Sequence, residues 1–148
     1  MAQSMSQRIE PLQQLAKTRE DQAACRLSEA QRRLEEREAR LRELSGFCLE
    51  YEPRATVTST QLLLNARLFV TRLREAEAFQ SQLTQQARVE LEAERKRWLQ
   101  RHRETSTLDQ LADVYRDREG QIERRRGQRV LDDHALRQHQ AGDAGEPR

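Results

Sequence analysis

The stretch FCLEYEPRATVTSTQLLLNARLF, from Phe47 to Phe69, interrupts two long and heavily charged runs of sequence that favour helix. Pro53 has no N–H group to donate to a helical ladder, and its ring disfavours helical angles at the preceding residue. The next segment, Thr56-Val57-Thr58, is β-branched and uncharged. Because the sequence on both sides has helical periodicity, this stretch predicts a hinge near residues 52–60 that folds one helical arm back on the other.

The composition of the 148-residue chain limits the thickness of its core. Hydrophobic residues make up 35% of the chain and charged residues another 35%, whereas an ordinary globular domain is about 45–50% apolar. The chain has only five glycines and three prolines, so we expect long helices rather than disorder. The predicted fold is all-α: a long antiparallel coiled-coil hairpin whose second helix is longer than the first.

The charges and the cysteines exclude several classes of protein. The 27 basic and 25 acidic residues are interspersed, which is typical of an ion-paired surface rather than of a nucleic-acid footprint. No apolar run reaches about 18 residues, and the start at Met1 lacks the apolar core of a signal peptide. We therefore expect a cytoplasmic protein with no direct membrane insertion, in which Cys25 and Cys48 are reduced thiols.

Before the hinge, residues at alternating steps of four and three define a seam, the stripe that one coiled-coil helix presents to another. Its members are Ala16, Glu20, Ala23, Leu27, Ala30, Leu34, Arg37, Leu41, Leu44, Cys48 and Tyr51. A seam of about five heptads predicts a coiled coil. We expect residues 1–8 to be frayed, the hairpin to span residues 9–138, and Pro11 to lie in the first turn of the first helix.

After the hinge, Ser59 or Thr60 can cap a second helix. Its predicted seam comprises Leu62, Ala66, Phe69, Leu73, Ala76, Gln80, Leu83, Ala87, Leu91, Trp98, Leu108, Ala112, Tyr115 and Ile122. Two successive steps of four around Ala87 predict a stutter, which unwinds a supercoil locally. Gly120 and Gly127 weaken the helix, and residues 139–148 are expected to be a disordered tail.

The position of the hinge predicts which residues face one another. A reversal near residues 55–57 places Leu44 opposite Phe69 and Leu34 opposite Gln80. The first helix then ends opposite about residue 105, and the segment from Leu108 to Leu136 extends beyond its partner helix. Its uncovered apolar residues, which suggest docking onto another protein, are Leu111, Tyr115, Ile122, Val130 and Leu131.

Catalytic and metal-binding patterns are missing from the sequence. His102, His134 and His139 do not have the spacing of a zinc-protease helix, and no glycine-rich phosphate loop occurs. Asp132, Asp133 and His134 are adjacent on a predicted helix, so their side chains point in different directions. We therefore expect neither enzyme activity nor a metal or cofactor.

Two clusters of side chains, one basic and one aromatic, favour a function in binding. The densest basic cluster, Arg124, Arg125, Arg126 and Arg129, has acidic neighbours and no aromatic platform, which favours an acidic protein surface over nucleic acid or lipid. The aromatic residues Phe47, Tyr51, Phe69 and Phe79 lie within reach of the hinge. They can close the end of the hairpin, or they can also remain exposed as binding anchors.

The order of several short motifs resembles the FliJ family of flagellar type III export proteins. The motifs are Arg8-Ile9-Glu10-Pro11-Leu12, Leu15-Ala16, Glu50-Tyr51, Thr58-Ser59, Asn65, Phe69, Leu73, Ala76, Trp98, Gln128-Arg129 and Asp132-Asp133. The resemblance implies a small helical hairpin, similar to the central stalk of rotary ATPases. It also implies a cytoplasmic component held peripherally at the inner face of the cell membrane through the export apparatus.

The same resemblance implies partners and contact residues. The partners are the hexameric flagellar export ATPase and the cytoplasmic domain of the export gate, with export chaperones as a further class left open. The implied gate-binding residues are Arg40, Leu44, Phe47, Tyr51, Phe69, Leu73, Ala76 and Gln80. For the ATPase ring, the overhanging segment and its arginines offer Leu111, Tyr115, Ile122, Arg125 and Arg129.

Two other functions remain open on the sequence. The chain could extend and pair with copies of itself as a structural homo-oligomer, with Glu20 and Arg37 on the seam setting the register. It could also be a nucleic-acid-binding arm, whose affinity would fall steeply with salt.

Overall fold

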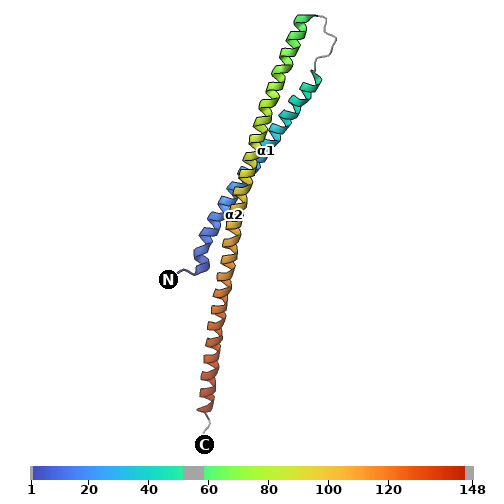
Figure 1. Cartoon of the computed structure of the whole chain (residues 1–148). Coiled ribbons are helices and arrows are strands. Elements are labelled where there is room, and N and C mark those ends of the chain that lie inside the picture. The colour runs from blue at the N-terminus through green and yellow to red at the C-terminus, as the bar shows by residue number, and fades with distance from the viewer. Residues whose placement is uncertain (1, 52–58, 146–148) are drawn as a thin grey trace. The chain divides into compact units, whose positions relative to one another are not determined.

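The computed structural model describes residues 2–51 and 59–145, all but a few of which are helical. Helix α1 spans Met5–Glu50 and helix α2 spans Thr60–Asp143 (Figure 1). The two helices pack against each other and the second is longer, which confirms the predicted fold class. Pro53 and Thr56-Val57-Thr58, on which the predicted hinge rests, lie outside the described residues.

The chain forms two compact units. The hinge unit is Thr18–His102, and the terminal unit combines Met1–Lys17 with Arg103–Arg148. In each unit a segment of α1 packs antiparallel to a segment of α2, and the two units are described separately below.

A capping box begins α1 earlier than the apolar pattern predicts. The Ser4 N–H group donates to Gln7 Oε1 (3.1 Å), and the Gln7 N–H group donates to Ser4 Oγ (3.3 Å). These reciprocal bonds satisfy two of the amide groups that a helix start leaves unpaired. The helix therefore begins at Met5 rather than near Ile9, and Pro11 lies inside it rather than in its first turn.

Helix α2 begins where the sequence predicts and continues further than expected. It starts at Thr60 with Ser59 in the capping position, and the Leu63 N–H group donates to the Ser59 carbonyl (3.1 Å). Gly120 and Gly127 remain helical, since two isolated glycines cost only about 1 kcal/mol each relative to alanine. The helix ends at Asp143, beyond the residue 138 limit predicted for the hairpin.

The burial of α1 follows its predicted seam. Ala16, Glu20, Ala23, Ala30 and Leu34 are all at most 9% exposed. The later seam positions up to Cys48 are half-buried. Tyr51 is the exception, because half of its surface is exposed.

The burial of α2 corrects its predicted seam. Val70, Glu77 and Thr84 take the inward positions that the apolar pattern assigned to Phe69, Ala76 and Leu83. The steps of three and four then continue without a stutter through Leu63, Ala66, Val70, Leu73, Glu77, Gln80, Thr84, Ala87, Leu91, Glu94, Trp98, Arg101, Thr105, Leu108, Ala112, Tyr115 and Glu119. Thr84 tolerates burial because its hydroxyl donates to the Gln80 carbonyl (2.8 Å) and approaches the Arg37 carbonyl (3.4 Å).

The pairing of the helices in the hinge unit also differs from the prediction. Leu34 packs with Ala87 and Leu91 in the buried cluster, whereas the expected partner Gln80 donates instead to the Arg37 carbonyl (3.3 Å). At the hinge end Tyr51, not Leu44, meets Phe69. The prediction assumed a symmetric reversal, but the first turns of α2 extend past the last turn of α1 (Figure 1).

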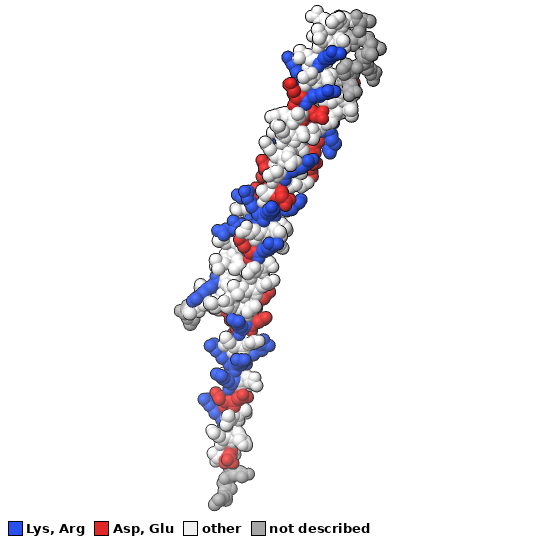
Figure 2. All heavy atoms as spheres, in the orientation of Figure 1, with Lys and Arg blue, Asp and Glu red and all other residues white. Residues whose placement is uncertain are grey.

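Ion pairs flank this core on the surface. Arg33 lies 3.5 Å from Glu90, and Arg88 lies 3.6 Å from Glu38, with all four side chains at least one third exposed. Figure 2 shows basic and acidic side chains interspersed over the visible face. Exposed pairs contribute at most about 1 kcal/mol each, so the buried seams must supply most of the stability.

In the terminal unit α1 covers more of α2 than predicted. Gln13 Nε2 donates to Asp109 Oδ1 (2.9 Å), and Ser6 bonds to Glu119. Between these contacts Ile9 and Ala112 are buried, at 7% and 0% exposure. The unpaired part of α2 therefore begins after Gly120 rather than near Leu108, because every residue from 121 to 145 is exposed.

The contact between Ser6 and Glu119 predicts a pH-dependent start of α1. The Ser6 hydroxyl and N–H group donate to the Glu119 carboxylate (2.6 and 3.1 Å), and these bonds hold the pKa of Glu119 below its ordinary value of 4.5, the hydroxyl bond having the larger effect. A lowered pKa means that the stabilisation is present above the ordinary value and is lost as the pH falls through the lowered one.

We therefore expect the protection of the first-turn amides of α1 against hydrogen exchange to fall as the pH is lowered from the ordinary pKa of 4.5 through the lowered pKa of Glu119. Amide exchange followed by NMR measures it. In Glu119→Gln the protection should not change over this range. An unchanged protection in the wild-type chain would contradict a role for the carboxylate.

Candidate partner-binding surfaces

Three aromatic side chains form a ladder at the hinge end of the hinge unit. Phe47 and Tyr51 are one helical turn apart, and their ring centroids are separated by 6.3 Å. The Tyr51 ring then meets Phe69 of α2 edge-to-face, with 5.6 Å between centroids and an interplanar angle of 85°. Aromatic pairs prefer this geometry, so the aromatic ladder (Phe47, Tyr51 and Phe69) joins the two helices.

The rings of the aromatic ladder pack against one another and also remain accessible to solvent. Phe47, Tyr51 and Phe69 are 45%, 50% and 52% exposed. Phe69 stands at the edge of the helix interface because its neighbour Val70, which is 6% exposed, takes the inward position. Phe79 is also exposed but has no ring contact with the ladder among the described residues. Clustered half-exposed aromatic rings are typical of protein-binding surfaces.

The other residues of the predicted gate-binding set divide by burial. Arg40 and Ala76 are exposed, and Leu44 and Leu73 are half-buried on the seams. Gln80 is only 7% exposed, and its amide donates to the Arg37 carbonyl. Gln80 is thus positioned to support the packing beneath the surface rather than to contact a partner.

The second surface is the unpaired segment, residues 121–143 of α2. Its large exposed apolar residues are Ile122, Val130, Leu131 and Leu136, each at least half exposed. Arg125 and Arg129 are exposed on the same segment. At 1.5 Å per residue it is roughly 35 Å long, and Figure 1 shows it continuing past the start of α1.

The residues predicted to contact the ATPase ring lie along one stripe of α2. Their spacings of four, seven, three and four place Leu111, Tyr115, Ile122, Arg125 and Arg129 on the same side of a helix. Leu111 is 40% exposed and Tyr115 is half-buried, both within the part of α2 that α1 accompanies. The stripe therefore begins beside α1 and continues onto the unpaired segment.

Sequence reasoning missed a polar contact in the hinge unit. Glu20 Oε1 lies 3.0 Å from His102 Nδ1, and the His102 ring stacks on Trp98 with centroids 5.1 Å apart. Glu20 is 8% exposed, so this contact satisfies a nearly buried carboxylate. A corrected register could have predicted the pair, since it places a histidine opposite the only acidic seam residue of the first helix.

The described residues provide few groups suited to metal binding or catalysis. Within residues 2–51 and 59–145 no group of three or more His, Cys, Asp and Glu side chains is placed to hold a metal ion, Asp132-Asp133-His134 included. No helix in this part of the chain is both long and apolar enough to cross a membrane. Cys25 and Cys48 are free thiols, and a hydrogen bond to Glu77 raises the pKa of Cys48.

Comparison with known proteins connects this architecture to a family. The family described as Flagellar FliJ protein matches residues 5–143, from the first residue of α1 to the last residue of α2. Neither curated proteins nor solved structures gave a match. Because the match covers nearly all of the chain, the chain belongs to the FliJ family, whose members are non-enzymatic components of the flagellar export apparatus.

Proposed function

We propose that the chain is an accessory protein of the flagellar type III export apparatus with two binding surfaces. The stripe from Leu111 to Arg129 contacts the hexameric export ATPase, and the aromatic ladder contacts the cytoplasmic domain of the export gate. The observation that carries the proposal is the unpaired segment, an exposed helix with apolar and basic residues that α1 does not accompany. The proposal rests further on membership of the FliJ family.

The composition of the stripe supports a protein partner. A single helix gains little stability from its own hydrogen bonds, so an exposed helical segment benefits from packing against another surface. Leu111, Tyr115 and Ile122 supply the apolar contact, and Arg125 and Arg129 suit an acidic rim on the partner.

The gate-binding surface has the aromatic ladder at its centre. Large rings that are half exposed and already held by one another bind with little loss of side-chain freedom. Arg40 and Ala76 form the exposed edge of this surface, while Leu44, Leu73 and Gln80 support it from the helix interface.

In this proposal the protein works in the cytoplasm and is held at the inner face of the cell membrane by its partners.

The competing function is a homo-oligomer, in which the two seams pair copies of the chain. In this structure, however, the seams of α1 and α2 pack against each other. Light scattering at micromolar concentration should therefore report a monomer, and a stable dimer would favour the homo-oligomer.

Shortening the chain tests the ATPase contact. A chain ending at Gln121 keeps the bond between Ser6 and Glu119 and removes Ile122, Arg125 and Arg129. We expect it to bind the export ATPase at least about tenfold more weakly than the full chain in a pull-down titration, since these residues supply the centre of the contact.

Binding to the gate domain provides the control, because the aromatic ladder remains in the shortened chain. The proposal predicts equal gate binding by both chains. Equal recovery of the ATPase by both chains would reject the unpaired segment as its binding element.

A further inference from the structure

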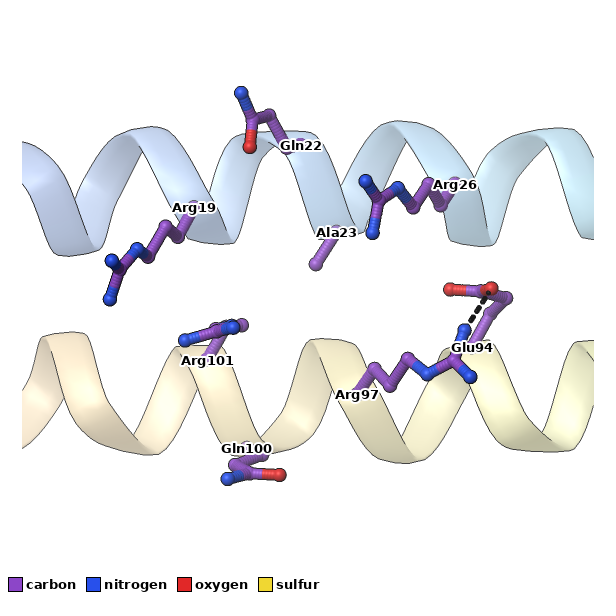
Figure 3. A pocket seen from close by; sticks show the side chains of 8 residues that line it. All are labelled: Arg19, Gln22, Ala23, Arg26, Glu94, Arg97, Gln100 and Arg101. Carbon is purple, nitrogen blue, oxygen red and sulfur yellow. Dashed lines mark hydrogen bonds and ion pairs between the residues drawn. The ribbon is translucent and has the colours of Figure 1, made fainter.

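A groove lined by four arginines lies between the two helices of the hinge unit, away from the aromatic ladder. Arg19 and Arg26 come from α1, and Arg97 and Arg101 come from α2. The groove encloses about 440 Å³. Figure 3 shows the guanidinium groups of Arg19 and Arg101 toward one end and those of Arg26 and Arg97 toward the other, with Ala23 between the helices.

The groove exists because a small residue occupies a seam position. Ala23 is 7% exposed and projects only a methyl group toward α2. The long arginine side chains on either side form the walls, with their charged ends at the surface. Arginine side chains thus surround a space that a larger residue at position 23 would fill.

The positive charge of this arginine groove is only partly neutralised. Arg97 pairs with Glu94 at 2.7 Å, and Arg101 also has an interaction partner. Arg19 and Arg26, in contrast, have no ion pair with any other described residue. The two lie seven residues apart on one face of α1, so their backbones are about 10.5 Å apart along the helix. An anion that uses both must therefore be elongated.

The lining also restricts the chemistry of a ligand. Ala23 is the only apolar residue among the eight that line the groove, so a docked peptide would find no apolar anchor there. No aromatic ring lines it, so a nucleobase would find no stacking platform. Guanidinium groups match phosphate oxygens through two parallel hydrogen bonds, and the volume is within the range of small-ligand sites.

We propose that the arginine groove binds a linear chain of phosphates, either inorganic polyphosphate or the phosphate tail of a nucleotide. Arg19 and Arg26 hold the two ends of the chain, and Arg97 and Arg101 approach it from α2. Because the ligand contacts both helices in the paired form, binding stabilises the hinge unit. This site is independent of the two protein-binding surfaces proposed above.

Isothermal titration calorimetry of the full chain with tripolyphosphate tests the proposal, at constant ionic strength so that general screening does not change. The double variant Arg19→Gln, Arg26→Gln should bind about tenfold more weakly or worse, since it loses two charge-assisted contacts. The matched control is Arg32→Gln, Arg72→Gln, which removes the same charge from exposed positions outside the groove. It should bind within about twofold of the wild-type chain.

Titrations with two further ligands show which part of the ligand the groove recognises. Inorganic monophosphate should bind much more weakly than tripolyphosphate, because it cannot span both arginines. ATP should bind about as well as tripolyphosphate if the phosphate chain alone is recognised. The proposal is overturned by an absence of binding to the wild-type chain, by equal losses in the two double variants, by monophosphate binding as well as tripolyphosphate, or by much tighter binding of ATP. Circular dichroism of each variant should show unchanged helicity.

Discussion

Replacing Phe47 with alanine is expected to weaken binding to the export-gate domain by about 2 kcal/mol or more, roughly thirtyfold, while helicity remains unchanged. Phe47 is the first ring of the aromatic ladder, and its only ring contact among the described residues is Tyr51, at 6.3 Å. Because the ring is 45% exposed, its loss should cost the fold no more than about 1 kcal/mol. Surface plasmon resonance with the immobilised gate domain measures the affinity.

Phe79→Ala is the matched control for this experiment. It removes the same side chain from another exposed position, 61% accessible and outside the ladder. We expect its affinity for the gate to equal that of the wild-type chain. If both variants lose affinity equally, general surface hydrophobicity rather than the ladder explains binding; if neither does, the gate contacts another surface.

The largest loss of stability is expected for Leu34→Ala. Leu34 is 8% exposed and belongs to the cluster with Ala30, Ala87 and Leu91, which is the apolar core of the hinge unit. Leucine-to-alanine changes in a core cost about 2–5 kcal/mol, and a core only two helices thick should place this one near the lower end. Urea unfolding followed by circular dichroism measures the change.

Leu131→Ala serves as the comparison, since Leu131 is 70% exposed on the unpaired segment. Its free energy of unfolding should stay within about 0.5 kcal/mol of the wild-type value. Similar losses in the two variants would contradict the assignment of the core to the cluster around Leu34.

The first helix and the fold class were predictable because the seam residues of α1 are regularly spaced and differ clearly in polarity from their neighbours. Small or apolar residues such as Ala23, Ala30 and Leu34 stand among charged neighbours, so the heptad pattern has one solution. Glu20 follows the pattern despite its charge, and the structure provides His102 as its partner. The apolar pattern does not predict the start of α1, because the capping-box residues Ser4 and Gln7 are polar.

The seam of α2 was harder to predict because hydrophobicity and position disagree there. Thr84 is buried although its neighbour Leu83 is more apolar, and Val70 is buried beside a more prominent Phe69. Hydrogen bonds to carbonyl groups make the polar choice at Thr84 acceptable, and a sequence pattern does not show them. The predicted pairing of facing residues was wrong for a related reason. The position of the turn alone does not determine how far α2 extends past the end of α1.

The candidate surfaces were predicted in part. Aromatic residues near the hinge pointed to an exposed cluster, but only the structure joins Phe47, Tyr51 and Phe69 into a ladder and leaves Phe79 outside it. The sequence predicts an unpaired segment, but the incorrect pairing of the two helices places its start too early, near Leu108. The arginine groove needs arginines from two helices, so neither helix alone reveals it.

Sequential binding on one sensor tests most directly whether the chain uses two separate surfaces for two partners. The chain is first captured by the immobilised gate domain, and the export ATPase is then added. The aromatic ladder and the stripe from Leu111 to Arg129 share no residue and belong to different units. We predict that the gate-bound chain binds the ATPase with the affinity of the free chain. Failure of the gate-bound chain to bind the ATPase would contradict the two-surface proposal.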